Sequence, residues 1–133
     1  MNSAFEAELY VHAIATEREA ARRYAELAER MVRQDDRAAA LFRRLAQVEA
    51  RRLADLRRES AGLELPDLSA DHSWRMDGRD SLDIALRAEK AARAFFEQAA
   101  RTAPDPVVRA LALEMAAEEA AHADLIMRLA ARR

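Results

Sequence analysis

The sequence of 133 residues contains no cysteine, only two glycines and only three prolines. Without cysteine the chain forms neither a disulfide nor a thiolate metal site such as a zinc ribbon or a rubredoxin module. Glycine and proline are the residues that most often interrupt helices, and the rest of the chain is rich in Ala, Leu, Glu and Arg. This composition favours helix nearly everywhere. A chain of this length holds one domain with a sizeable core, here residues 1–133.

The sequence also lacks a large excess of one charge and any long apolar run. Its net charge is -2, and basic residues are interleaved with acidic ones, so it offers no general case for binding nucleic acid or a membrane. No stretch approaches the roughly 20 apolar residues that cross a bilayer. Residues 1–8 lack the basic start and apolar centre of a signal peptide. We therefore expect a soluble cytoplasmic protein.

Hydrophobic residues recur three and four positions apart in four segments, which predicts helices over about 3–34, 36–60, 81–103 and 106–132. Asp105 and Pro106 give a strong start signal for the last helix, at its N-cap and first helical position. Both glycines and one proline fall in residues 61–80, which predicts one long connection. A connection of this length can cross a bundle and join helices that run in the same direction. The predicted fold is all-α, a four-helix bundle of two helical hairpins joined by this crossover.

Two further expectations concern packing outside the helix centres. In the crossover, Trp74 and either Leu65 or Leu68 are expected to anchor the chain against the bundle. The Ala-rich stretch of residues 38–40 is expected on the exterior, where it could support a homodimer.

Each predicted helix carries one glutamate in the middle of its hydrophobic stripe, where an unpaired charge costs several kcal/mol to bury. These residues are Glu17, Glu49, Glu89 and Glu119. His122 follows Glu119 by three residues, so the two side chains share one face of their helix. A carboxylate and an imidazole carried into a core need partners, and the remaining glutamates indicate what those partners are.

The two halves of the sequence repeat this pattern without gaps in the aligned segments. The matched pairs are Glu17 with Glu89, Tyr24 with Phe96, Glu49 with Glu119, and Arg52 with His122. One Glu from each of two helices and a Glu-x-x-His from each of the other two form the carboxylate scaffold of di-iron and di-manganese bundles. Carboxylates and imidazoles suit two hard to borderline cations. Five of the six positions match this scaffold, and the sixth is Arg52.

With these motifs the sequence resembles the ferritin-like superfamily, specifically its rubrerythrin-type members, over nearly its whole length. The resemblance implies a ferritin-like fold and a non-haem di-iron centre that reduces peroxide or oxidises ferrous iron with dioxygen, using an external electron donor. The expected cofactor is iron, as one or two ions, with manganese as an alternative. Rubrerythrins often carry another glutamate one turn further along the third helix, where this chain has Ala92 and Arg93. The implied metal ligands are Glu17, Glu49, Glu89, Glu119 and His122.

Arg52 is the main departure from that family pattern, because a guanidinium has no free lone pair for a metal. If its head group turns inward, it can hold Glu49 and replace part of the charge of a second metal, leaving a single-metal, non-catalytic module. If it extends outward along the helix, two metals bind and water fills the missing position, and an oxidoreductase stays the leading interpretation. In a third interpretation, Arg52 and His122 neutralise the glutamates of a metal-free bundle.

The remaining candidates lie outside the set of implied metal ligands. Tyr24 is expected to pack beside the site, with a hydrogen bond to a ligand carboxylate or a redox role as alternatives. Glu114 and Glu118 flank the last motif and are expected to be solvated or outside the ligand set, although Glu118 could act as an outer ligand. His12 is expected on the surface, and His72 receives no role.

Overall fold

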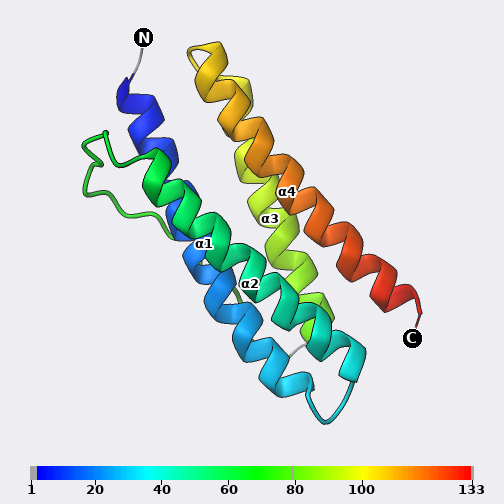
Figure 1. The fold of residues 1–133 in the computed structure, drawn as a ribbon. Coiled ribbons are helices and arrows are strands. Elements are labelled where there is room, and N and C mark those ends of the chain that lie inside the picture. The colour runs from blue at the N-terminus through cyan, green and yellow to red at the C-terminus, as the bar shows by residue number, and fades with distance from the viewer. Residues whose placement is uncertain (1–2, 79, 133) are drawn as a thin grey trace.

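The computed structural model describes residues 3–78 and 80–132, and this part of the chain folds into four helices. They are α1 (Ser3–Met31), α2 (Asp36–Glu59), α3 (Ser81–Thr102) and α4 (Pro106–Ala131). Figure 1 shows α1 and α2 as one antiparallel hairpin and α3 and α4 as another, lying side by side. The all-α four-helix bundle predicted from the sequence is confirmed, and α1 ends three residues before its expected end.

Aspartates begin three of the helices. The side chains of Asp35, Asp80 and Asp105 each accept a hydrogen bond from a backbone N–H two or three residues further on. These N–H groups have no partner within the helix, so the caps satisfy them. Pro106 occupies the first turn of α4, as expected for a residue that lacks an N–H and has a fixed φ.

The core consists of two hydrophobic clusters at opposite ends of the bundle. The turn-end cluster, near the α1–α2 turn, includes Tyr24 and Phe42, and the far-end cluster includes Phe96 and Met115. On every helix the buried glutamate of the predicted stripe lies between residues of these two clusters. The acids therefore form a polar layer across the middle of the bundle, and each cluster closes one side of it.

The long connection joins α2 to α3, and Figure 1 shows these two helices running in the same direction, as predicted. Trp74 is 9% exposed and packs into the turn-end cluster, which confirms its expected role as an anchor. Leu65 is exposed, so that alternative is wrong, while Leu68 is half-buried. Leu63 packs against the far-end cluster instead.

The expectation for the Ala-rich stretch was wrong in part. Ala38 and Ala39 are buried in the turn-end cluster, and of the three residues only Ala40 is exposed. Small side chains here let α2 approach its neighbours closely rather than form an external surface. A homodimer stays a prediction without this support.

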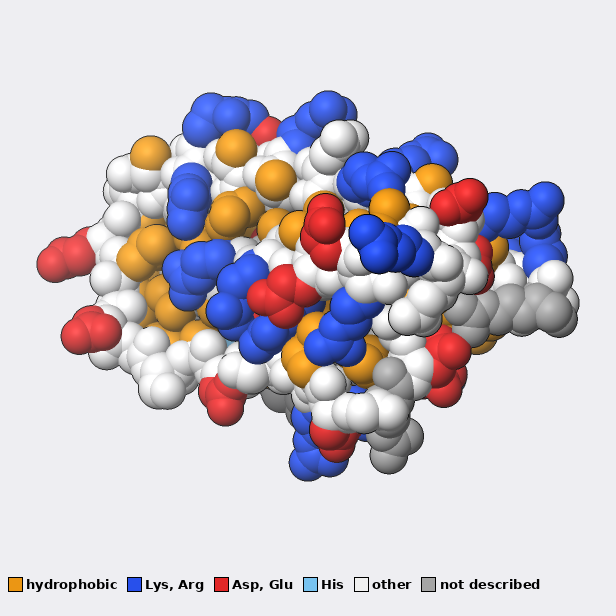
Figure 2. Space-filling view, turned by 90° about the horizontal axis from the view of Figure 1, so that it is seen from below, with side chains coloured by type: hydrophobic (Ala, Val, Ile, Leu, Met, Phe, Trp, Pro, Cys, Tyr) orange, Lys and Arg blue, Asp and Glu red, His pale blue; other side chains and the backbone are white. Residues whose placement is uncertain are grey.

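The outer surface carries both signs of charge. Figure 2 shows basic and acidic side chains interspersed on the face seen from below, with hydrophobic side chains between them. Exposed hydrophobic residues include Val107 and Leu113 on α4. Within residues 3–78 and 80–132, no helix is long and apolar enough to cross a membrane.

Candidate metal centre

All five residues proposed as metal ligands meet in the polar layer at the middle of the bundle. The four glutamates are at most 1% exposed and His122 is 8% exposed. Each helix contributes one glutamate, because each carries its acid at the centre of its buried stripe. The fold thus places together the residues that the internal repeat singled out: Glu17, Glu49, Glu89, Glu119 and His122.

His122 connects three helices within this layer. Its Nδ1 atom lies 2.9 Å from Oε1 of Glu49 on α2 and 3.0 Å from Oε2 of Glu89 on α3. Burial alone would lower the pKa of His122, but the two carboxylates raise it to about 10. Without a metal, the imidazole therefore carries a proton and balances part of the negative charge around it.

One imidazolium leaves most of the carboxylate oxygens unsatisfied. Within the described residues, no N–H group or hydroxyl donates a hydrogen bond to either oxygen of Glu17 or of Glu119. Burial, followed by the charges of Glu89 and Glu49, raises the pKa of Glu119 well above its usual range. Native proteins rarely leave buried acceptors without a partner. Oxygen-rich, electron-rich surroundings of this kind fit a bound cation, so the residues present match the metal that the family pattern implies.

The ligand atoms fall into two overlapping groups. One contains Glu49, Glu119 and His122, and the other contains Glu17, Glu118 and Glu119. Within each group the potential ligand atoms lie within 4.8 Å of one another. Glu119 belongs to both groups and is therefore the residue that links them. The second group includes Glu118, which was expected outside the ligand set or, as the alternative, as an outer ligand.

Arg52 adopts neither of the two orientations considered from the sequence. Its side chain is 10% exposed, and its guanidinium lies 3.0 Å from Glu114, 3.3 Å from Glu118 and 3.5 Å from Glu59. Glu114 and Glu118 are on α4, so the side chain bridges α2 and α4 at the edge of the polar layer. Among the described residues its ion-pair partners are these three acids, and Glu49 is paired with His122 instead.

Comparison with known proteins identifies this scaffold. A family model described as Rubrerythrin matches residues 80–133, the region that holds Glu89, Glu119 and His122. The crystal structure of an uncharacterized conserved protein from Magnetospirillum magnetotacticum MS-1 is similar, with 32% sequence identity and a TM-score of 0.85. The alignment covers 92% of this chain and 91% of that one. The chain belongs to the rubrerythrin family of ferritin-like proteins. No curated protein matches it significantly.

Membership of the rubrerythrin family supports iron as the metal bound by the buried carboxylates.

Tyr24 serves mainly in packing, as expected. It is fully buried, stacks on Phe42 with ring centroids 5.8 Å apart and meets Trp74 edge-on at 4.9 Å. Burial and the nearby charges of Glu89 and Glu119 raise the pKa of its hydroxyl well above the usual value. The phenol therefore keeps its proton beside the carboxylates.

A cavity of about 420 Å³ lies between α1, α3 and the crossover and reaches the polar layer at Glu89. Ala92 lines it, and its small side chain leaves room there. Small reactants could approach the carboxylates by this route. The other lining residues include His12, His72, Trp74, Arg87 and Phe95.

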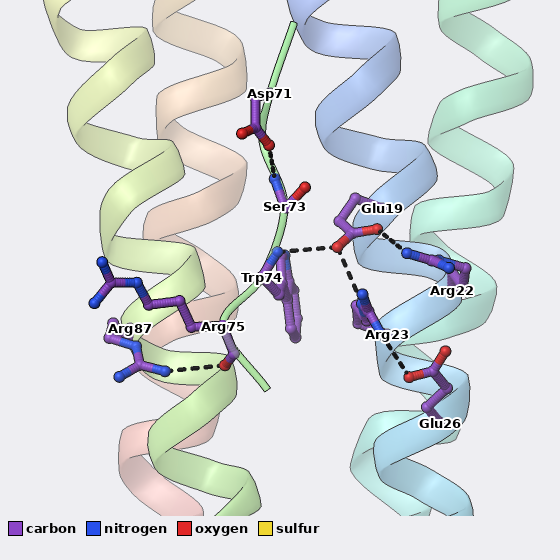
Figure 3. A network of polar contacts seen from close by, with 9 residues as sticks. All are labelled: Glu19, Arg22, Arg23, Glu26, Asp71, Ser73, Trp74, Arg75 and Arg87. Carbon is purple, nitrogen blue, oxygen red and sulfur yellow. Dashed lines mark hydrogen bonds and ion pairs between the residues drawn. The ribbon is translucent and has the colours of Figure 1, made fainter. Parts of the chain in front are cut away.

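Two contacts of the crossover were not found from the sequence. Nδ1 of His12 and Nε2 of His72 lie 2.8 Å apart, and both rings contact Phe95. His12 was expected on the surface and His72 without a role, because the pair is separated by 60 residues. Figure 3 shows the second contact: the backbone N–H of Trp74 donates to Glu19 at 2.9 Å. No local signal in the sequence indicates either pairing.

Proposed function

We propose that this member of the rubrerythrin family binds iron in its buried carboxylate layer and works as an oxidoreductase, in which ferrous iron is oxidised by peroxide or dioxygen. The observation that carries the proposal is the set of four buried glutamates around His122, two of which lack any hydrogen-bond donor among the described residues. A metal-free core would gain nothing from so many unsatisfied oxygens.

The donor set decides which residues would hold the metal. Glu49, Glu119 and His122 form one group of ligands, with Glu89 beside His122 at 3.0 Å. Bound iron would supply one electron per ferrous ion, so two ions reduce one hydrogen peroxide to two waters while two protons are taken up. An external donor must return the iron to the ferrous state. The chain itself supplies position, charge and protection from water.

Protons in the layer link metal binding to pH. His122 holds a proton in the metal-free chain, and Glu119 keeps its own to an unusually high pH. Both protons must leave before the imidazole nitrogen and the carboxylate act as ligands. The hydrophobic clusters on either side exclude water from the layer, while the cavity at Glu89 gives small oxidants access.

The test is ferrous loading without oxygen, followed by one addition of hydrogen peroxide. We expect bound iron by elemental analysis after desalting, a ferric absorbance on oxidation, and about one peroxide consumed per two irons. Glu119→Ala should lose the iron and behave like ferrous iron in buffer alone. Wild-type protein that retains no iron after desalting would contradict the proposal.

A non-catalytic module with a single metal is the second candidate function. The observation in its favour is Arg52, which occupies the position of the expected second histidine. This alternative predicts at most one iron per chain and no peroxide-dependent turnover with an added reductant. The same loading experiment separates the two candidates.

A further inference from the structure

We infer that Glu118 is a metal ligand that replaces the histidine missing at position 52. This assignment rests on the proposed binding of iron in the carboxylate layer. It goes further by giving the second cation a ligand from the opposite hairpin, outside the Glu-x-x-His pattern.

The geometry around Glu17 is the first support. Its side chain is completely buried, and within residues 3–78 and 80–132 no hydrogen-bond donor meets either of its oxygens. Glu118 and Glu119 on α4 form a compact group with it, in which one carboxylate oxygen of each residue lies within 4.8 Å of the others. A cation between these three carboxylates would satisfy the oxygens of Glu17, which the His122 group does not include.

The internal repeat is the second support. In the alignment of the two halves, Arg52 stands opposite His122, and Glu118 stands opposite Val48. Val48 is 39% exposed and cannot bind a metal. The first hairpin thus lacks a nitrogen ligand, and the second hairpin has an extra carboxylate that reaches the first hairpin's own Glu17. The two changes compensate each other across the bundle.

Arg52 then acts as a positioning residue for Glu118. Its Nε lies 3.3 Å from Oε2 of Glu118, and Nη2 lies 3.0 Å from Oε1 of Glu114. Glu118 is 33% exposed, so without this ion pair its side chain could turn into water. A carboxylate has two oxygens, so one can accept the guanidinium while the other faces the cation. The resulting position is made of oxygen ligands alone, which suits Mn²⁺ and Fe²⁺.

The experiment counts bound Mn²⁺, which needs no oxygen-free handling, by the loss of the free-ion electron paramagnetic resonance signal. The matched pair of variants is Glu118→Gln and Glu114→Gln, because both acids pair with Arg52 but only Glu118 belongs to a ligand group. We expect two ions per chain in the wild type and in Glu114→Gln, and one in Glu118→Gln. Helicity by circular dichroism checks that each variant is folded.

Other counts overturn the inference in distinguishable ways. Two ions in Glu118→Gln, or one ion in both the wild type and Glu118→Gln, would show that Glu118 is not a ligand while leaving metal binding intact. No ion in the wild type, confirmed with Fe²⁺, would overturn the inference together with the proposed function. Loss of an ion in both Glu118→Gln and Glu114→Gln would assign the effect to the Arg52 ion pairs instead.

Discussion

The two hairpins of this bundle share one plan and differ at one ligand position. Each pairs a helix carrying one buried glutamate with a helix carrying a Glu-x-x motif, and all four glutamates enter the same layer. At the last position of the motif, His122 points to the carboxylates of Glu49 and Glu89, while Arg52 reaches along the edge of the layer to acids of α4. The four glutamates of the layer therefore follow the internal symmetry of the fold, whereas the last position of the Glu-x-x motif does not.

The match to the family model also distinguishes the two hairpins. The Rubrerythrin model matches residues 80–133, the hairpin that keeps the histidine. The same hairpin carries Glu118, the residue that we assign to the metal position of the other half. We therefore expect different effects from three kinds of substitution. Those that break the carboxylate layer should have the largest effect, those that restore its symmetry a smaller one, and those that loosen the crossover the smallest.

The largest effect is expected from Glu119→Gln, which breaks the layer where the two ligand groups meet. Metal affinity should fall by more than the roughly 10–100-fold typical of residues that only support a ligand. The metal-free protein should become more stable by roughly 0.5–2 kcal/mol, because a carboxyl crowded by other acids is replaced by a neutral amide. Manganese titration and thermal melting in chelator measure the two changes. A lower melting temperature for metal-free Glu119→Gln would mean that its carboxyl is well satisfied without metal.

The second prediction restores the symmetry. Arg52→His should supply the missing nitrogen ligand, so that Glu118 is no longer needed for the second ion. The double variant Arg52→His/Glu118→Gln should bind two ions per chain where Glu118→Gln alone binds one. Loss of the partly exposed ion pairs of Arg52 should cost about 1 kcal/mol or less. If the double variant also binds one ion, the two residues do not serve the same metal position.

The sequence predicted what depends on local patterns and on the repeat. Helix limits follow from the spacing of hydrophobic residues and from caps such as Asp105, and the acid layer follows from one glutamate per stripe. The direction of Arg52 could not be predicted, because a long flexible side chain turns toward whichever acids the other hairpin presents. The contact between His12 and His72 was also beyond prediction, since it depends on how the crossover lies against α1.

The third prediction concerns Glu19, a site where the two halves differ because its counterpart is Ala91. Glu19 accepts the Trp74 N–H and pairs with Arg22 and Arg23, which holds the crossover to α1 (Figure 3). Glu19→Gln should weaken this attachment by about 1–2 kcal/mol. Because Trp74 is the one tryptophan of the chain, its emission should shift to the red.

Glu26→Gln is the matched control for this change, because Glu26 pairs with Arg23 and does not contact Trp74 in the described structure. Burial raises the pKa of Glu19, but the Trp74 N–H and the two arginines lower it more. The stabilisation by ionised Glu19 is therefore complete above its ordinary pKa of 4.5 and is lost as the pH falls through the lowered value. An unchanged emission spectrum in Glu19→Gln would show that hydrophobic packing alone holds Trp74.

The smallest effect is expected at the contact of His12 with His72, which has no counterpart in the second half because Ile84 aligns with His12. Burial lowers the pKa of both imidazoles, and the proximity of His12 lowers that of His72 further. At neutral pH one ring donates to the other, and this contribution is fully present above the ordinary pKa of 6.5. As the pH falls through the lowered values, the unfolded chain takes up protons more readily, so the folded state loses about 1 kcal/mol or less. Trp74 emission should show a small step at a higher pH than the Glu19 transition, and the double variant His12→Gln/His72→Gln should remove that step. A step that persists in the double variant would place its origin outside this pair, since glutamine can hydrogen-bond but does not titrate.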